Sequence, residues 1–251
     1  MRFLRTLLLA LALAPLAAYG SEAGMRLDRA PDKTRDLAAL QNGAKLFVNY
    51  CLNCHGASYM RYNRLRDLGL TDQQIKDNLM FTADKVGELM KVAIRPGEAK
   101  EWFGAAPPDL TVIARARASE AGSGADWLYT YLRTFYRDDK RPTGWNNLLF
   151  ENVGMPHVLW QLQGEQVVEV EKAKDSHGAE TEHKKLKLEK AGSMKAAEYD
   201  AAVADLVAFL VYMGEPVAET RKQIGIIVLV VLSILFVLAY ALKRNYWKDV
   251  H

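Results

Sequence analysis

The apolar residues of this chain are concentrated near its two ends. Residues 7–18 form an apolar run of twelve, and residues 224–242 form a run of nineteen that contains no charge. Between the two runs, apolar and polar residues recur with spacings typical of helices and strands. The pattern predicts one folded domain with a hydrophobic segment on either side of it.

The first apolar run resembles a secretory signal peptide. Arg2 and Arg5 give it a positive start, and twelve apolar residues are too few to span a bilayer comfortably. Small residues follow, and positions 18–20 fit a cleavage site. We therefore expect residues 1–20 to be a signal peptide, with a retained N-terminal anchor as the alternative.

The second apolar run is long enough to cross a membrane. Nineteen residues of helix extend for about 28 Å, close to the thickness of the hydrocarbon core. Basic residues flank the run on both sides, and Tyr246 and Trp247 suit the membrane interface. We expect a transmembrane anchor at residues 221–243 and a cytoplasmic tail at residues 244–251, with a buried core helix as the alternative.

A signal peptide followed by one C-terminal span also predicts an orientation. Residues 21–220 would lie in the periplasm and the short basic tail inside, as in a single-pass protein of the inner (cytoplasmic) membrane. The whole chain has a net charge of +3, but residues 21–220 hold 26 basic and 29 acidic residues. This mildly acidic domain favours a basic partner, and nothing in its charge points to nucleic acid.

Helical spacing predominates within the domain. Amphipathic patterns predict helices at residues 36–50, 71–91, 127–136 and 196–213. Alternating residues at 166–171 and 182–190, separated by a polar stretch, predict a β-hairpin. The expected fold class is therefore mainly α, with loop and β-hairpin excursions and one C-terminal transmembrane helix.

Cys51 and Cys54 are the two cysteines of the chain, and His55 follows them in "CLNCH". A C-x-x-C pair in an exported chain fits a disulfide or a redox dithiol, but the residues before Cys51 have helical spacing, unlike a thioredoxin site. Structural zinc needs four ligands, and no second cysteine pair exists. C-x-x-C-H is also the attachment motif of a c-type haem, with two thioether bonds and His55 as an axial iron ligand. Export favours this interpretation.

The methionines predict the second axial ligand. Electron-transfer haems usually carry Met or His opposite the first histidine. Most methionines here lie in helical patterns or too near the attachment site, whereas Met155 lies between Gly154 and Pro156. A turn is expected there, and a loop can bring a thioether over the haem. Met155 is the predicted ligand; His157 is its rival, and an ordinary core or surface methionine is the alternative.

Four stretches together resemble the cytochrome c1 family, the haem subunit of the cytochrome bc1 complex, in its proteobacterial form. They are "CLNCH", "APPDLTVIARAR" at residues 106–117, "GMPHVLW" at residues 154–160, and the C-terminal span. The resemblance covers almost the whole mature chain. C-x-x-C-H is shared by all c-type cytochromes, so the proline and arginine stretch is the more specific signal.

The resemblance implies a class I cytochrome c-type helical domain with one covalently bound haem c. It implies these roles: Cys51 and Cys54 as thioether sites, His55 and Met155 as axial iron ligands, Pro107 and Pro108 near the haem edge, and Arg117 paired with a haem propionate. A guanidinium suits such a carboxylate, and a solvated helix face is the alternative for Arg117. A glycine at position 43 would let Phe209 or Tyr212 of the last helix approach closely.

The resemblance also implies a function. The chain would carry single electrons from the Rieske iron–sulfur protein to a soluble or membrane-bound cytochrome c in a respiratory or photosynthetic chain. It would be anchored beside cytochrome b in a dimeric complex, with no bond-making catalytic site of its own. The alternative is a free-standing anchored c-type cytochrome that donates to a terminal oxidase. A thiol–disulfide oxidoreductase and a haem-free structural anchor are further classes.

Overall fold

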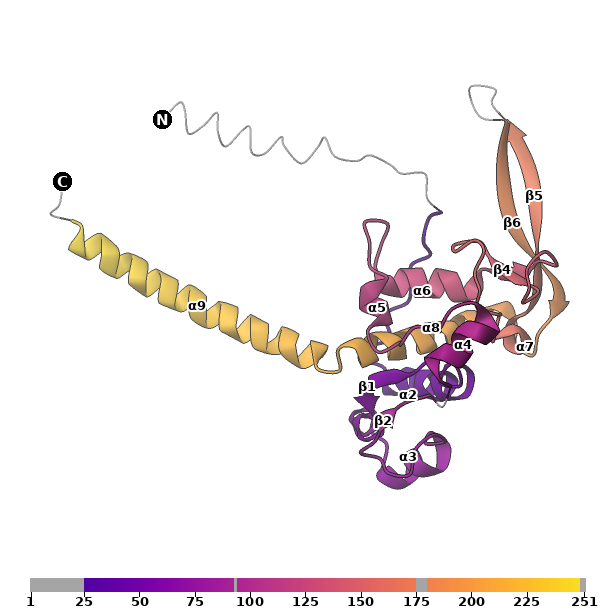
Figure 1. Cartoon of the computed structure of the whole chain (residues 1–251). Helices are drawn as coiled ribbons and strands as arrows, with labels where there is room; N and C mark the ends of the chain where they lie inside the picture. Colours follow the sequence, from indigo (N-terminus) through magenta and orange to yellow (C-terminus); the bar gives the residue numbers. More distant parts are fainter. Residues whose placement is uncertain (1–24, 93, 175–179, 249–251) are drawn as a thin grey trace.

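A computed structural model describes residues 25–92, 94–174 and 180–248 of the chain. The predicted signal peptide, residues 1–20, and the last three residues of the predicted tail lie outside these described residues. The described part is a mainly helical domain from which one long helix and one β-hairpin project (Figure 1). The predicted fold class is confirmed: each sheet in these ranges has two strands, and an apolar helix follows the domain.

Helices α2 (Leu37–Leu46) and α8 (Ala196–Gly214) pack against each other in the core. Gly43 lies where they meet. A Cβ at this position would collide with the carbonyl oxygen of Asp205 and lie 2.7 Å from the Cβ of Phe209. The expected close approach at Gly43 is therefore confirmed for Phe209, whereas the hydroxyl of Tyr212 donates to the carbonyl of Arg64, 2.9 Å away.

The last turn of the first helix is wider than an α-helical turn. It forms the π-helix η2 (Phe47–Cys51), and the N–H of Leu52 donates to the carbonyl of Phe47 at 3.0 Å. This hydrogen bond encloses one residue more than an α-helical bond does. Phe47 also packs on Phe209, with ring centroids 5.6 Å apart. The predicted helix over residues 36–50 is therefore present, but it ends as a π-helix.

The prediction of a helix over residues 71–91 is wrong beyond Asn78. A capping box between Thr71 and Gln74 starts helix α3, and the helix ends at Asn78, with Leu79 as its C-cap. The carbonyls at positions 86 and 88 then accept hydrogen bonds from the backbone of residues 63 and 62, and β2 pairs with β1. Pairing with an earlier segment thus overrides the helical spacing of residues 79–91. The elements of this region are β1 (Ala57–Arg61), η3 (Tyr62–Leu68), α3 (Asp72–Asn78) and β2 (Leu89–Met90).

The helix predicted at residues 127–136 lies about three residues earlier in the chain. Ser123 and Asp126 form a capping box, so helix α6 begins at Gly124. It ends at Arg133, because Phe135 enters a strand and pairs with Asn147. The elements of this region are α4 (Pro96–Phe103), α5 (Ile113–Ala116), α6 (Gly124–Arg133), β3 (Phe135–Arg137), β4 (Trp145–Asn147) and α7 (Trp160–Gln163).

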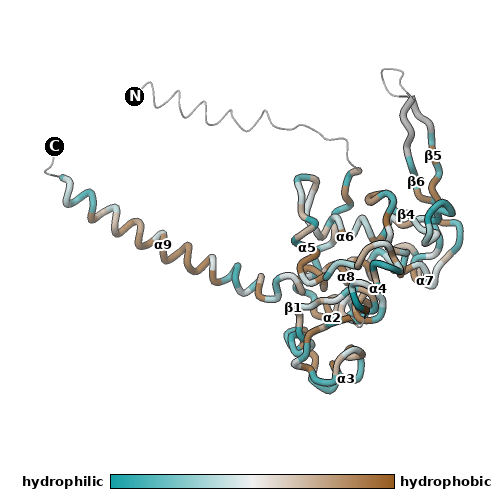
Figure 2. Tube along the Cα trace, viewed as in Figure 1, coloured by the Kyte–Doolittle hydropathy of each residue, from teal (hydrophilic) through white to brown (hydrophobic). Residues whose placement is uncertain are grey.

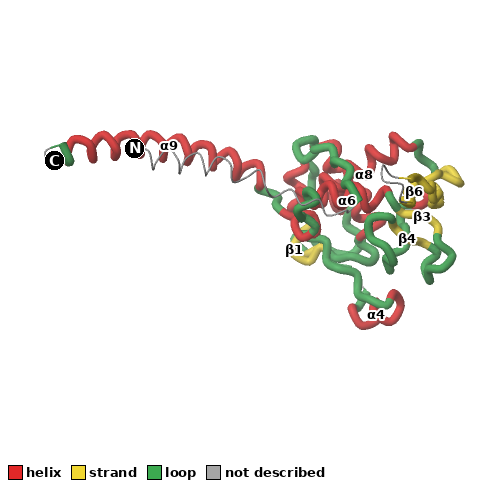
Figure 3. The backbone as a smooth tube through the Cα atoms, turned by 90° about the horizontal axis from the view of Figure 1, so that it is seen from above, coloured by secondary structure: helices red, strands yellow, loops and turns green. Residues whose placement is uncertain are grey.

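The predicted β-hairpin is confirmed as strands β5 (Gly164–Lys174) and β6 (Glu180–Ala191), which pair antiparallel. Figure 3 shows its strands in yellow beside β3 and β4, at the end of the domain opposite the long helix. Near its base, Gln166 donates to the carbonyls of Arg133 and Phe135 at 3.1 and 3.0 Å. These bonds join the hairpin to the end of α6.

Helix α9 (Ala218–Tyr246) follows the domain. Its 29 residues would extend for about 43 Å, and within the described ranges it is the one helix long and apolar enough to cross a membrane. Its apolar side chains are exposed. In Figure 2 the tube of α9 is brown, the colour of hydrophobic residues, over much of its length beyond the domain. The helix includes the whole predicted anchor at residues 221–243.

Candidate functional site

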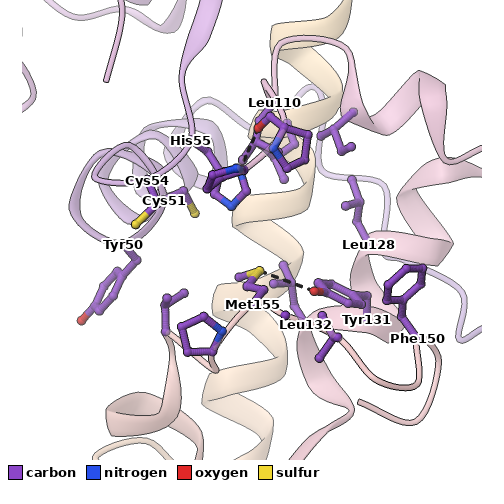
Figure 4. A pocket seen from close by; sticks show the side chains of 18 of the residues that line it. Tyr50, Cys51, Cys54, His55, Leu110, Leu128, Tyr131, Leu132, Phe150 and Met155 are labelled. Carbon is purple, nitrogen blue, oxygen red and sulfur yellow. Dashed lines mark hydrogen bonds between the residues drawn. The ribbon is translucent and has the colours of Figure 1, made fainter. Parts of the chain in front are cut away.

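A cavity of about 310 Å³ lies between η2, α6, α8 and two loops, residues 103–110 and 150–158. Its lining is mostly apolar, which suits a large hydrophobic ligand. The structure brings all of the predicted site residues to this cavity: Cys51, Cys54, His55, Pro107, Pro108, Arg117 and Met155. Figure 4 shows His55 and Met155 on opposite sides, with the cysteines on one flank and Tyr131 on the other.

We call residues 47–55 the proximal wall of the cavity. The N–H groups of Cys54 and His55 both donate to the carbonyl of Cys51, at 3.1 and 2.8 Å, and form a tight turn. Both cysteines are free thiols, with Cys51 buried and Cys54 half-buried. Burial and the neighbouring Cys54 raise the pKa of Cys51 to about 12. The turn therefore presents two thiols and an imidazole to one side of the cavity.

The ring of His55 is oriented by a backbone group. Its Nδ1 lies 2.7 Å from the carbonyl oxygen of Pro108. A carbonyl can only accept, so Nδ1 carries the proton and Nε2 is left as the ligand atom. Burial lowers the pKa of His55 below its usual 6.5, although Pro108 and Asp109 oppose the shift. His55 is thus a neutral imidazole in the tautomer that a metal requires.

We call residues 145–156 the distal wall, and Met155 lies at its end. Among the methionines that the structure describes, Met155 alone lines the cavity. Met60, Met90 and Met213 are buried elsewhere in the core. The sulfur of Met155 accepts a hydrogen bond from the hydroxyl of Tyr131 at 3.5 Å (Figure 4). A thioether therefore faces the imidazole across the cavity.

His157, the rival to Met155, does not line the cavity. It is 2% exposed, stacks on Phe135 with ring centroids 4.9 Å apart, and meets the edge of Trp145 at 5.1 Å. Burial lowers the pKa of His157 to about 4. Its place behind the distal wall is that of a neutral core residue.

Arg117 reaches the cavity beside two aromatic rings. Its guanidinium carbon lies 4.3 Å from the ring centroid of Trp127 and 5.7 Å from that of Phe150. No carboxylate in the described ranges pairs with it, whereas Arg115 lies outside the cavity, 3.7 Å from Glu215. Cation–π contacts hold the guanidinium in place and leave its N–H groups available for an anion.

Sequence reasoning missed Asn147, which is fully buried and organises the distal wall. Its amide nitrogen donates to the carbonyl of Tyr131 at 2.8 Å, which joins the wall to α6. Its amide oxygen accepts three hydrogen bonds, from the N–H of Leu149 at 2.9 Å, the N–H of Phe150 at 3.0 Å and the hydroxyl of Thr134 at 3.3 Å. The only signal in the sequence is an asparagine pair in a stretch without periodicity.

The residues around the cavity fit a haem c. Two thiols lie on one flank, an imidazole and a thioether face each other across an apolar space, and a guanidinium without a carboxylate partner lies at the rim. Among the described residues, no three His, Cys, Asp or Glu side chains cluster as a metal site. This donor set suits a metal whose other ligands come from a macrocycle.

Comparisons with known proteins extend along the whole chain. The model of the Cytochrome C1 family matches residues 29–250. The chain is 49% identical to the ammonia monooxygenase gamma subunit of Nitrosomonas europaea, over 100% of both chains. It is 48% identical to cytochrome c1 of Allochromatium vinosum, over 99% of this chain and 100% of that one. Identity to cytochrome c1 of Rhodospirillum rubrum is 28%, over 86% of this chain and 83% of that one.

Proposed function

Because the chain belongs to the cytochrome c1 family, we propose that it carries single electrons from the Rieske iron–sulfur protein to cytochrome c within the cytochrome bc1 complex. The observation that carries this proposal is the arrangement of His55 and Met155 across one apolar cavity, with Cys51 and Cys54 on its flank. A covalent haem c supplies reversible one-electron oxidation and reduction of iron when it is bound there.

The protein residues hold and tune this group. Cys51 and Cys54 would provide the sulfurs that hold the haem by two thioether bonds, and His55 Nε2 and Met155 Sδ would be the ligand atoms for its iron. Pro108 fixes the tautomer of His55 through the hydrogen bond to its carbonyl. The apolar lining would keep water from the iron, and a Met/His pair in such surroundings would favour a fairly high midpoint potential. The chain makes and breaks no substrate bond.

Arg117 and the two prolines hold the edge of the same group. The guanidinium of Arg117, free of any carboxylate in the described ranges, is positioned to bind a haem propionate. Such a pair would keep a carboxylate charged at the rim of an apolar cavity. Pro107 and Pro108 line the cavity and would cover the haem edge.

Helix α9 anchors the domain in the membrane, and we infer its orientation from the charges around it. Lys243, Arg244 and Lys248 follow the apolar stretch and favour the cytoplasmic side. The haem domain would then face the periplasm of the inner membrane. Cytochrome b beside α9, the Rieske protein and a cytochrome c acceptor are the partners of this proposal, in a dimeric complex.

One purification experiment distinguishes the proposed function from two alternatives. A free-standing carrier would be isolated without cytochrome b, and one relative is named as a subunit of ammonia monooxygenase. We expect the chain, solubilised in mild detergent with α9 intact, to co-purify with cytochrome b and a Rieske protein. Isolation without either protein, but with haem, would support a free-standing carrier. Isolation with ammonia monooxygenase subunits would support the other name.

The haem ligands have their own test. A pyridine haemochrome spectrum of the purified chain should show covalently bound haem c. Met155→Leu should abolish the Met-to-iron absorption band and lower the midpoint potential by more than about 59 mV, a tenfold change in the one-electron equilibrium. Met60→Leu is the control, since Met60 is buried but does not line the cavity. A band that persists in Met155→Leu would assign the ligand to another residue.

A further inference from the structure

Arg141 lies in the turn between β3 and β4 and binds the loop that carries Met155. Its guanidinium donates two hydrogen bonds to Asn152, one to the backbone carbonyl at 2.8 Å and one to the side-chain oxygen at 3.2 Å. A guanidinium presents its N–H groups in a fixed planar geometry, so it can hold one residue at two points. Asn152 is three positions before Met155. The contact therefore lies just ahead of the predicted distal ligand.

The distal wall changes direction at Asn152. Its φ is 62°, and within the described residues it is the one residue other than glycine with a positive φ. This left-handed conformation is unfavourable for most side chains and persists where surrounding contacts maintain it. Phe150 and Asn152 are exposed, whereas Val153 is buried and lines the cavity together with Met155. The conformation of Asn152 thus determines how the loop enters the cavity.

The turn that contains Arg141 is itself fixed. The N–H of Arg141 donates to the carbonyl of Asp138 at 3.0 Å, and the N–H of Gly144 donates to the carbonyl of Arg141 at 2.9 Å. The Asp138 carboxylate accepts a hydrogen bond from the amide of Asn146 at 2.8 Å. The side-chain oxygen of Asn146 accepts one from the N–H of Asn152 at 2.9 Å. Asn152 is therefore held at its N–H by Asn146 and at its carbonyl by Arg141.

The guanidinium of Arg141 is used for this contact. Its two bonds to Asn152 are the hydrogen bonds that it makes within the described part of the chain. Its Nε is buried and has no partner among the described residues. Hydrogen bonds from a charged donor are stronger than those between neutral groups. The contact with Asn152 therefore accounts for where the guanidinium lies.

We propose that Arg141 is a positioning residue that holds Asn152 in its left-handed conformation and thereby keeps the Met155 thioether in the cavity. The inference rests on the proposed role of Met155 as distal ligand. The segment from Val153 onward cannot leave the cavity without turning about Asn152, and that turn breaks the charge-assisted bonds of Arg141. Arg141 therefore disfavours the open form of the distal loop.

Competition with imidazole measures this opening in the haem-loaded, full-length protein. Added imidazole binds the ferric haem only where Met155 has left it, so its apparent affinity reports the population of the open loop. Arg141→Gln loses the charge and the paired donors. We expect the apparent affinity for imidazole to rise about tenfold, equivalent to one charge-assisted hydrogen bond. Arg141→Lys can reach one acceptor, so a rise of about threefold is expected. Without imidazole, the Met-to-iron band should persist in both variants.

Arg66→Gln is the matched control. Arg66 donates to both carboxylate oxygens of Asp72, at 2.6 and 2.7 Å, and does not line the cavity. Its loss removes the same kind of paired contact outside the distal wall, so the affinity for imidazole should stay at the wild-type value. A rise in Arg66→Gln equal to that in Arg141→Gln would show that general loss of stability opens the loop, and the inference would fail.

The two Arg141 variants also separate this inference from the proposed function. Wild-type affinity for imidazole in both variants, with the band lost in Met155→Leu, would overturn the role of Arg141 and leave the proposed function intact. If Arg141→Gln does not retain haem, the affinity of Arg141→Lys decides in the same way. A band that persists in Met155→Leu would instead remove the ligand on which the inference rests.

Discussion

The proximal wall is the end of a helix packed on another helix, whereas the distal wall is a loop shaped by a buried side-chain amide. Gly43 lets α2 approach α8, and Phe47 packs on Phe209. On the other side, Asn147 bonds the backbone of its own loop and that of α6. Apolar packing maintains one wall, and specific hydrogen bonds maintain the other.

This difference means that the proximal wall contributes mainly to the stability of the domain, whereas the distal wall mainly positions a ligand. On the proximal wall, Cys51 to His55 follow one another within a single turn, so local structure is enough to position them. Met155 comes about one hundred residues later in the chain. Tertiary contacts must carry it to the opposite side of the cavity. Substitutions in the proximal wall should therefore mainly lower the free energy of unfolding, whereas substitutions in the distal wall should mainly weaken ligation by Met155.

The largest effect is expected at Gly43. In Gly43→Val the new side chain would collide with the Asp205 carbonyl and the Phe209 Cβ, so α2 and α8 must separate. We expect the free energy of unfolding to fall by about 3 kcal/mol or more, measured by chemical denaturation. Gly97→Val is the control, because a Cβ at Gly97 would meet no atom within 4 Å. Equal losses in the two variants would contradict a packing-dependent proximal wall.

A smaller loss of stability and a clear loss of ligation are expected at Asn147. Asn147→Ala removes the acceptor for the loop N–H groups and the donor to Tyr131, at a cost of about 2 kcal/mol. The Met-to-iron band should weaken while haem stays covalently attached. Asn49→Ala removes an exposed asparagine as the control. An intact band in Asn147→Ala would show that the loop keeps its shape without the amide.

The smallest effect is expected at Arg117. Arg117→Ala loses cation–π contacts with Trp127 and Phe150, worth about 1 kcal/mol. If the guanidinium binds a propionate, its loss also removes a positive charge that disfavours ferric iron. The midpoint potential should fall by less than about 59 mV. Arg115→Ala, outside the cavity, should leave it unchanged. Equal potentials in both variants would leave Arg117 as a packing residue only.

Much of the fold was predictable because the spacing of apolar residues along the chain indicates which side chains are buried. Helix α8, the β-hairpin and the apolar helix α9 lie where residue spacing placed them. The prediction of a helix over residues 71–91 was wrong because its second half accepts hydrogen bonds from the backbone of residues 62 and 63. No local pattern in the sequence encodes this pairing. The predicted bounds of α6 were wrong because a capping box at Ser123 starts the helix earlier and because Phe135 belongs to a strand, where it pairs with Asn147.

The candidate site was predictable to the extent that its residues are marked by chemistry or by family resemblance. Cys51, Cys54 and His55 form a compact motif, and a methionine between glycine and proline is unusual enough to notice. Tyr131 fits the apolar stripe of a helix, and Asn147 resembles any polar loop residue. Their roles depend on which groups the folded chain brings to them, so spacing alone could not reveal them.

The π-helical turn η2 also sets the rotation of the cysteine side chains relative to the helix face that packs on α8. Each residue of an α-helix advances the direction of its side chain by about 100°. The extra residue enclosed between Phe47 and Leu52 therefore rotates everything after it relative to the face that packs on α8. Gly43 and Phe47 keep their register against α8, while Cys51 and Cys54 keep theirs toward the cavity. A regular α-helix would fix one rotation for both sets of residues. The wide turn lets the residues that pack on α8 and the cysteines that face the cavity take different rotations about the helix axis.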